Sequence, residues 1–281
     1  MTFSIVAHDP AAQEWGVAVA SKFLAVGSVV PWARAGTGAV ATQSYANVAY
    51  GPDGLRAMES GESAEATIRR LTSTDDKRAL RQVGMIDAIG RAASFTGAEC
   101  FDWAGGRTGD GYACQGNILT GPHVVDQMVE AFEAASGDLT TRLLAALSAG
   151  DAAGGDRRGR QSAALLVVRQ GGGYLAGSDV AVDLRVDDHR DPVAELRRLV
   201  EIHRVLLPRP EDLEFVPIHA GLARVMRDAL SERGYDCGRG SGYDEDLRQA
   251  LFAWIGAENL EARWSDAAEI ERKVLEILSS R

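Results

Sequence analysis

The chain has 281 residues, of which 46% are hydrophobic and 25% charged, and this balance predicts a globular protein with one large domain and a smaller one. A formal net charge of −10 argues against nucleic acid and anionic membrane surfaces as partners. The three cysteines are an odd number and form no CxxC pair, so we expect neither a disulfide framework nor a zinc site.

The first elements of the chain form a predicted β-hairpin. Residues 3–8 alternate as a strand does, residues 9–13 carry turn-forming side chains, and residues 15–21 form the second strand. The elements predicted next are a strand over 38–43, a turn over 51–54, helical segments to about residue 80, strands over 83–88 and 92–95, a glycine-rich stretch over 103–111 and a strand over 112–115.

The second half of the chain carries clear helix boundaries. Pro122 fits the first position of a helix, where its missing N–H is not needed. Asp138 is the predicted N-cap of a helix over 139–149. The elements predicted after it are strands over 163–169 and 174–184 and a helix that opens at Asp191 and Pro192 and stops at Pro208.

Strands and helices come in blocks rather than in strict alternation. This order favours an α+β fold, with antiparallel sheets covered by helices, over a doubly wound parallel sheet. The polar segment 207–212 contains two prolines and is the best linker, so the predicted domains are 1–207 and 213–281. The second domain carries three helical patterns and little strand signal.

Thr2 is the first candidate catalytic residue. Removal of Met1 would leave Thr2 with a hydroxyl nucleophile and a free α-amine as its general base, so no separate histidine is required. Strand alternation places Ser4 on the same face, where it would support the site. The alternative is that the chain begins with Met-Thr by chance, as many proteins do.

Ser21 and Lys22 end the second predicted strand. Pairing with the first strand would bring them near Thr2, where a lysine cation would lower the pKa of the amine and stabilise an oxyanion. A solvated lysine at a strand end is the alternative, and taken alone it is the better interpretation.

Two further groups of polar residues stand at strand exits. Gln43, Ser44 and Asn47 are candidates for hydrogen bonds to a substrate. The residues Gln115, Gly116 and Asn117 are candidate donors to an oxyanion or to a substrate. For both groups, ordinary turn chemistry is the alternative.

The loop over 154–162 brings three arginines into an acidic protein. Asp156, Arg157 and Arg160 are candidates for substrate binding because a guanidinium fits a carboxylate or a phosphate, and a solvated basic loop is the alternative. No histidine has the spacing of a metal ligand, so we expect no metal and no cofactor. The opening residues lack a signal peptide, which predicts a cytoplasmic protein.

Several runs of residues together resemble the bacterial domain-of-unknown-function 1028 family. They are Phe3-Ser4-Ile5-Val6, Gly16-Val17-Ala18-Val19-Ala20-Ser21, 25–31, Ala41-Thr42-Gln43-Ser44, Tyr50-Gly51-Pro52, Tyr112, Gln115-Gly116-Asn117, 153–165 and 183–189. The resemblance implies the fold of N-terminal-nucleophile hydrolases, a four-layer αββα sandwich, whose members cleave C–N amide bonds. Residues 213–281 resemble a domain described as peptidoglycan-binding, and a packing or dimerisation module is the alternative for them.

The chain departs from the family after the Trp-Ala-Gly motif. Separately, the mechanism requires that Met1 be removed. Trp103-Ala104-Gly105 is followed by Gly106, where the family often has a histidine. Met1 precedes Thr2, and if Met1 is retained the amine mechanism fails. In that case Ser4, Ser21 or Ser44 would have to serve as the nucleophile.

The resulting hypothesis is a hydrolase of C–N amide or imide bonds in a small, carboxylated substrate, with Thr2 as the nucleophile. In it, Lys22 tunes the amine or holds the oxyanion, and Arg157 and Arg160 bind the carboxylate. The alternatives are a non-catalytic protein that binds a small peptide or muropeptide, and a structural partner in a complex. We expect a small-molecule partner, no nucleic acid and no membrane, and homo-oligomerisation stays open.

Overall fold

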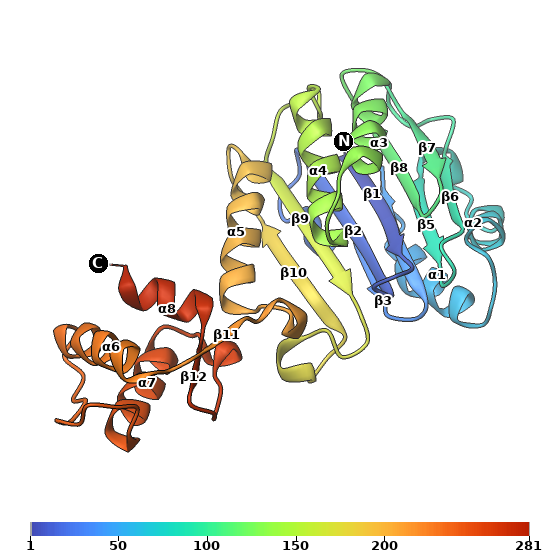
Figure 1. Cartoon of the computed structure of the whole chain (residues 1–281). Helices are drawn as coiled ribbons and strands as arrows, with labels where there is room; N and C mark the ends of the chain where they lie inside the picture. Colours follow the sequence, from blue (N-terminus) through green and yellow to red (C-terminus); the bar gives the residue numbers. More distant parts are fainter. Residues whose placement is uncertain (1, 281) are drawn as a thin grey trace. The chain divides into compact units, whose positions relative to one another are not determined.

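The computed structural model describes residues 2–280 and divides the chain into two compact units, Met1–Leu199 and Val200–Arg281. Helices and strands are mixed in both units, which confirms the predicted combination of the two (Figure 1). Among the described residues, no helix is long and apolar enough to cross a membrane.

A six-stranded antiparallel sheet forms the centre of the first unit, with the strand order β10-β9-β2-β1-β8-β7. Its strands are β1 (Thr2–Asp9), β2 (Glu14–Ser21), β7 (Gly105–Gly109), β8 (Tyr112–Asn117), β9 (Ser162–Val168) and β10 (Val180–Val186). The predicted hairpin is confirmed as β1 and β2, and β1 lies centrally between β2 and β8. Thr2 therefore pairs with Ser21 on one side and with Asn117 on the other.

A second antiparallel sheet has four strands in the order β3-β4-β5-β6. They are β3 (Pro31–Arg34), β4 (Gly38–Gln43), β5 (Gln82–Asp87) and β6 (Ala92–Thr96). The two sheets pack against each other, because Val6 and Val17 of the first share a buried cluster with Ala39 and Ile86 of the second.

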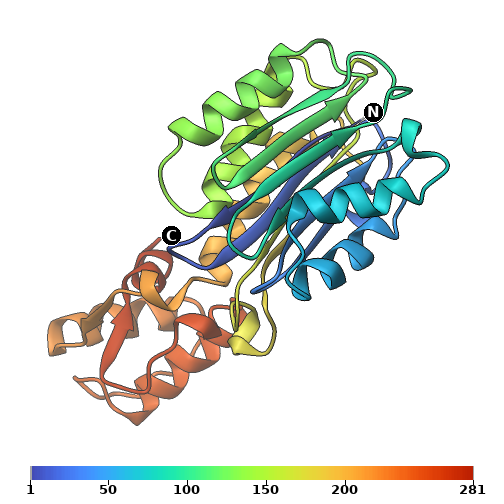
Figure 2. The ribbon, with the colours of Figure 1, turned by 90° about the vertical axis from the view of Figure 1, so that its right-hand side faces the viewer.

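Two helix pairs cover the sheets on opposite sides (Figure 2). Helices α1 (Tyr50–Glu59) and α2 (Ala64–Ser73) pack on the four-stranded sheet, and α3 (His123–Ala134) and α4 (Leu139–Ala152) pack on the six-stranded one. The predicted cap of α4 is confirmed, since the Asp138 carboxylate accepts the N–H of Thr141 at 2.8 Å. Pro122 directly precedes α3, one position from its predicted place.

The predicted turn over 51–54 is wrong, because these residues form the first turn of α1. The glycines there serve close packing rather than chain reversal. A Cβ on Gly51 would lie 2.4 Å from the ring of Trp32, and one on Gly54 would lie 3.0 Å from Met85. Contact with the sheet therefore overrides the low helix propensity of glycine.

One predicted strand needs correction, and two strands were missed. The strand predicted over 174–184 begins only at Val180, since Leu175 and Ala176 adopt left-handed conformations within a short 3-10 helix. The strands β3 and β7 were not predicted. β7 lies in the glycine-rich stretch, where no side-chain pattern indicates a strand, and it forms because β8 offers it a pairing edge.

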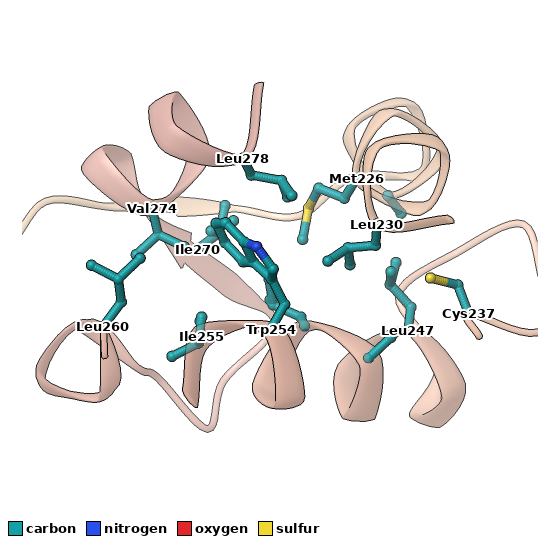
Figure 3. Packing of buried hydrophobic residues seen from close by; sticks show 13 residues of the cluster. Met226, Leu230, Cys237, Leu247, Trp254, Ile255, Leu260, Ile270, Val274 and Leu278 are labelled. Atoms are coloured by element: carbon teal, nitrogen blue, oxygen red, sulfur yellow. The ribbon is translucent and has the colours of Figure 1, made fainter. Parts of the chain in front are cut away.

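The second unit is built around its own buried cluster. Its elements are β11 (Phe215–Pro217), α6 (Ala220–Glu232), α7 (Glu245–Ala257), β12 (Glu269–Glu271) and α8 (Arg272–Ser279). Trp254 lies at the centre of the apolar side chains from these helices (Figure 3). The three predicted helices are confirmed, and the β11–β12 pair is an addition that the sequence did not indicate.

The remaining elements are one long helix and short 3-10 segments. Helix α5 (Pro192–Leu206) follows β10 along the chain. The 3-10 helices are Val26–Ser28, Arg78–Leu80, Tyr174–Ala176, Pro210–Asp212 and Glu261–Arg263.

Candidate active site

The space between the two sheets is apolar at one end and polar at the other. Strand alternation puts Thr2 and Ser4 on the same face of β1 as Val6, which packs against the second sheet. Toward the start of β1, serine, asparagine and glutamine side chains replace the valines and alanines. We call the end of the sheets at which β1 begins the Thr2 end.

Thr2 itself is nearly enclosed, with 6% of its surface exposed. Its Oγ1 atom lies 3.1 Å from the Oγ atom of Ser21, its partner in the β1–β2 register. The Thr2 carbonyl accepts a long hydrogen bond of 3.4 Å from Nε2 of Gln43 on the facing sheet. The hydroxyl therefore has a fixed neighbour, because strand pairing holds Ser21 opposite Thr2.

Ser4, Gln43 and Gln115 form a buried chain of hydrogen bonds behind Thr2. The Ser4 hydroxyl donates to Oε1 of Gln43 at 2.7 Å and accepts from Nε2 of Gln115, also at 2.7 Å. Nε2 of Gln115 is also 3.3 Å from the Ser4 carbonyl. Gln115 lies directly over Gly84, where a Cβ would come within 2.1 Å of its Oε1 atom. Ser4 and Gln115 therefore join β1 and β8 to the facing four-stranded sheet.

Gln82 is the central residue of this network, and the sequence analysis missed it. Its Oε1 atom accepts from Nε2 of Gln43 at 2.8 Å and from Nδ2 of Asn117 at 2.9 Å. Its Nε2 atom donates to the Gly116 carbonyl at 2.7 Å. The predicted strand began at residue 83, one position too late. The signal that could have found Gln82 is the period of two that links it to Gly84 and the buried Ile86.

A charged cluster follows the end of β2 at the Thr2 end, and it contains Lys22, Asp156 and Arg160. The buried Asp156 carboxylate accepts the backbone N–H of Lys22 at 2.8 Å and that of Arg158 at 2.8 Å. The exposed Lys22 ammonium donates to the Arg160 carbonyl at 3.3 Å, and no contact between described atoms joins it to Thr2. Arg160 donates to Asp151 at 2.7 Å, and this bond raises the pKa of the guanidinium, which stays charged.

A cavity of about 220 Å³ opens beside these residues. It is lined by Phe3, Ala20, Ser21, Asp151, Gly154, Asp156, Gly159, Arg160 and Pro192. Phe3 and Ala20 point to the helix-covered face of the sheet, opposite to Thr2 Oγ1. The cavity thus begins one residue from Thr2 and shares Ser21 with it.

Three predicted site residues lie at the Thr2 end without joining this network. The Asn47 side chain donates to Asp75 at 3.2 Å, in a separate cluster that also contains Tyr50. Ser44 is half-buried in a left-handed conformation just after β4. Arg157 is exposed, and within residues 2–280 its side chain makes no hydrogen bond or ion pair.

The Asp75 cluster fixes the loop after β4. Asp75 accepts from Nε of Arg81 at 2.9 Å, and this bond is the main reason why the pKa of Asp75 lies well below its usual range. Burial and the hydrogen bond to Asp75 raise the pKa of Tyr50. Arg81 also donates to the Tyr45 carbonyl, so the ion pair holds the turn that follows Gln43.

Two further predictions concern a metal site and the removal of Met1. Within the described range, no three histidine, cysteine, aspartate or glutamate side chains come close enough to hold a metal ion. The removal of Met1, on which the amine of Thr2 depends, concerns a residue outside the described range.

Comparison with known proteins places the chain in a family. The model of a family of unknown function, DUF1028, matches residues 2–196, and a model described as "Putative peptidoglycan binding domain" matches residues 206–278. None of the curated proteins matches the chain.

A solved structure supports the family match. The crystal structure of protein SPO2555 from Silicibacter pomeroyi, which has the same family model, is similar to this chain with a TM-score of 0.66 and 35% sequence identity. The similarity covers 72% of this chain and 89% of that one. Together with the match over residues 2–196, it shows that this chain belongs to the DUF1028 family.

Proposed function

We propose that this protein hydrolyses C–N amide bonds, with Thr2 as an N-terminal nucleophile after removal of Met1. The proposal rests mainly on one observation. Thr2 begins the central strand β1 and holds its Oγ1 atom 3.1 Å from the Ser21 hydroxyl, at the polar end of the space between two sheets. A buried hydroxyl fixed in this way is ready for attack once a base stands beside it.

The arrangement of elements supports the same proposal. The two antiparallel sheets pack face to face, and each carries a pair of helices on its outer side. This is the order of layers that we expect for the αββα sandwich of N-terminal-nucleophile hydrolases. Thr2 stands at the start of a central strand of this arrangement.

The proposed reaction begins with proton transfer from Thr2 Oγ1 to the free α-amine of Thr2, which titrates near neutral pH. Oγ1 attacks the amide carbon, and the amine passes the proton to the leaving nitrogen as the C–N bond breaks. The acyl group is left as an ester on Thr2. A water molecule, deprotonated by the same amine, then attacks the ester carbon. As the ester C–O bond breaks, the amine returns the proton to Thr2 Oγ1 and the acid is released.

Asn117 is the side chain we assign to the oxyanion. One of its Nδ2 hydrogens is donated to Gln82 at 2.9 Å, which fixes the amide plane, and the second remains for a developing negative charge. Gln115 has its Nε2 atom engaged by the carbonyl and the hydroxyl of Ser4, so we assign it to positioning. Lys22 adds positive charge at the edge of the site, where its ammonium group donates to the Arg160 carbonyl.

Arg160 is the proposed binder of a substrate carboxylate. It lines the cavity that shares Ser21 with the nucleophile, and 47% of its side chain is exposed. Asp151 occupies Nε of Arg160, and the terminal nitrogens of the guanidinium stay available for a carboxylate. Arg157 lies on the same loop and adds a second cation.

The test measures the intact mass of the purified protein before and after incubation with a β-lactone, an electrophile that acylates such nucleophiles. We expect loss of Met1 and one adduct that maps to Thr2. Thr2→Ser should keep the adduct, because serine retains a hydroxyl and an amine, and Thr2→Ala should lose it. Ser60→Ala, an exposed hydroxyl at the end of α1, is the control and should react as the wild type does.

Retained Met1 and the absence of an adduct would refute this mechanism. Labelling of Ser4 or Ser21 in place of Thr2 would move the nucleophile to that residue. Amide substrates that carry a carboxylate should then be screened only on protein whose N-terminal residue has been shown to be Thr2.

A second candidate function is the binding of a small peptide or muropeptide without turnover. The match of residues 206–278 to a peptidoglycan-binding model favours it. Calorimetric titration with a soluble muropeptide distinguishes the two functions. Binding that persists in Thr2→Ala, with no product released by the wild type, would support the binding protein over the hydrolase.

A further inference from the structure

Large apolar side chains are exposed at the Thr2 end. Phe23 is 51% exposed, Leu24 59%, Tyr45 63% and Phe101 53%, and we call these four residues the apolar rim. Phe23, Leu24 and Tyr45 come within three positions of a site residue in the chain. Phe101 is joined by a backbone hydrogen bond to the residue after Asn117. Exposure of single apolar residues is ordinary, but four of them in the segments next to the strand ends at Thr2 require an explanation.

The rim residues lie next to the strand ends that surround Thr2. Phe23 comes two positions after Ser21, and Tyr45 comes two positions after Gln43. The Phe101 carbonyl accepts the N–H of Ile118 at 2.9 Å, directly after Asn117. Three separate segments therefore bring an aromatic ring to the same end of the molecule.

Tyr45 and Phe101 contact each other beside the ends of β4 and β8. Their ring centroids are 6.2 Å apart with an interplanar angle of 52°, a favourable tilted arrangement. Tyr45 follows β4 of the four-stranded sheet, whereas Phe101 pairs with the segment that follows β8 of the six-stranded sheet. Each ring keeps more than half of its surface open.

The backbone that presents Tyr45 is strained and firmly held. Ser44 and Tyr45 both have left-handed backbones, with φ of 58° and 46°, which is costly for residues other than glycine. Arg81 donates to the Tyr45 carbonyl while its ion pair with Asp75 is largely buried. The Arg81 carbonyl accepts from the thiol of Cys100, the neighbour of Phe101.

The side chain of Arg81 thus holds the turn at Tyr45, and its backbone carbonyl holds the residue before Phe101. Such strain around two exposed rings adds little to the stability of the fold, because neither ring is buried. Strained turns of this kind are concentrated at ligand-binding sites. The arrangement is therefore better explained by a ligand than by packing.

We propose that Tyr45 and Phe101 form an aromatic subsite that selects amides carrying a planar, aromatic group near the scissile carbonyl. Phe23 and Leu24 follow Ser21 at the end of β2. The proposal rests on the proposed function, because it names the substrate class of the Thr2 site. It places the aromatic group between the two sheet ends and leaves the cavity with Arg160 for the carboxylate.

The experiment compares the rates at which two β-lactones acylate Thr2. One carries a phenethyl group and the other an n-propyl group, and the readout is adduct formation followed by intact mass. We expect the wild type to react about 5-fold faster with the aromatic lactone, as the energy of one aromatic contact predicts. Tyr45→Ala/Phe101→Ala should bring the ratio of the two rates close to one.

Two further variants test whether the rings themselves are responsible. Tyr45→Phe keeps the ring and should keep the wild-type ratio. Ile89→Ala removes an even more exposed apolar side chain from the turn between β5 and β6, at the opposite end of the sheets, and should also keep the wild-type ratio. A wild-type ratio near one, or an unchanged ratio in the double alanine variant, would overturn the subsite.

The remaining outcomes separate the subsite from its premise and from other occupants. No adduct with either lactone would refute Thr2 as nucleophile, and the subsite with it. Light scattering on the same samples measures the oligomeric state. A wild-type dimer that becomes a monomer in the double variant would identify the rim as an interface between copies and overturn its role in substrate selection.

Discussion

Buried amide side chains join the two sheets at the Thr2 end. Gln82, Gln43 and Asn117 are almost fully enclosed, and each of them has hydrogen-bond partners there. Amide groups can donate and accept at once, so a few of them can join two sheets without burying a charge. Thr2 thus borders a network of uncharged side chains.

Gln82→Leu tests this network at the residue scale. Leucine fills a similar volume, but it leaves Nε2 of Gln43, Nδ2 of Asn117 and the Gly116 carbonyl without their partner. We expect the free energy of unfolding in urea to fall by about 3 kcal/mol, since each buried unsatisfied group costs about 1–3 kcal/mol. Gln127→Leu, on the exposed side of α3, should change it by less than about 0.5 kcal/mol. Equal unfolding midpoints for the two variants would contradict the role of Gln82.

The elements that the sequence predicted well have a strong local pattern. The hairpin of β1 and β2 alternates, α4 has an aspartate cap, and β4 coincides with its predicted range of residues. The elements that it missed depend on distant partners. Helix α1 accepts its glycines because Trp32 lies against Gly51 and Met85 against Gly54, and β7 exists because β8 offers an edge.

The loop after β4 gives a test at the element scale, through Asp75. Arg81 lowers the pKa of Asp75, so the charged carboxylate stabilises the fold above the ordinary aspartate pKa, and this stabilisation is lost as the pH falls toward the lowered value. Asp75→Asn should reduce the free energy of unfolding at pH 7 by about 3 kcal/mol, as expected when a buried pair loses one partner. The difference from the wild type should shrink in acid below about pH 4.

The neighbouring residue provides the control for this variant. Asp76 is exposed, and Asp76→Asn should leave the free energy of unfolding within about 0.5 kcal/mol of the wild type. Urea titrations from pH 3 to pH 8 measure all three proteins. A difference between Asp75→Asn and the wild type that does not change with pH would show that the ion pair is not its source.

At the scale of the whole molecule, the chain has two compact units with separate buried clusters. In the first unit one cluster lies between the sheets and another lies between the four-stranded sheet and helices α1 and α2. In the second unit a cluster surrounds Trp254 (Figure 3). Each cluster draws its residues from a single unit. We therefore expect the units to respond separately to changes in their cores.

Trp254→Ala tests this separation. Trp254 is 2% exposed, and its loss from the core should destabilise the second unit by about 3–5 kcal/mol. We expect calorimetry to show one unfolding transition shifted to lower temperature and the other unchanged. Phe252→Ala, a half-exposed aromatic on the same helix, should shift the transition much less. A shift of both transitions in Trp254→Ala would show that the units unfold together.

The candidate site shows how far sequence patterns reach. The sequence indicated polar residues at several strand exits, and the structure brings Thr2, Ser21, Gln43 and Asn117 to one end of the two sheets. Gln82 and the rings of Tyr45 and Phe101 were not identified. Their roles depend on which strands and loops come together in the fold. The residues next to them in the sequence do not indicate these long-range contacts.

The sequence by itself determined the mixed α/β architecture, the hairpin that begins at Thr2, the capped helices and the membership of the family. These follow from periodicity, capping and motif order, which act over a few residues or repeat along the chain. Only the tertiary structure decided the pairing of β1 between β2 and β8, the amide network around Gln82, the cavity beside Ser21 and the contact of Tyr45 with Phe101. Each of these joins residues tens of positions apart, and such contacts are fixed by sheet register and by the packing of one sheet on the other.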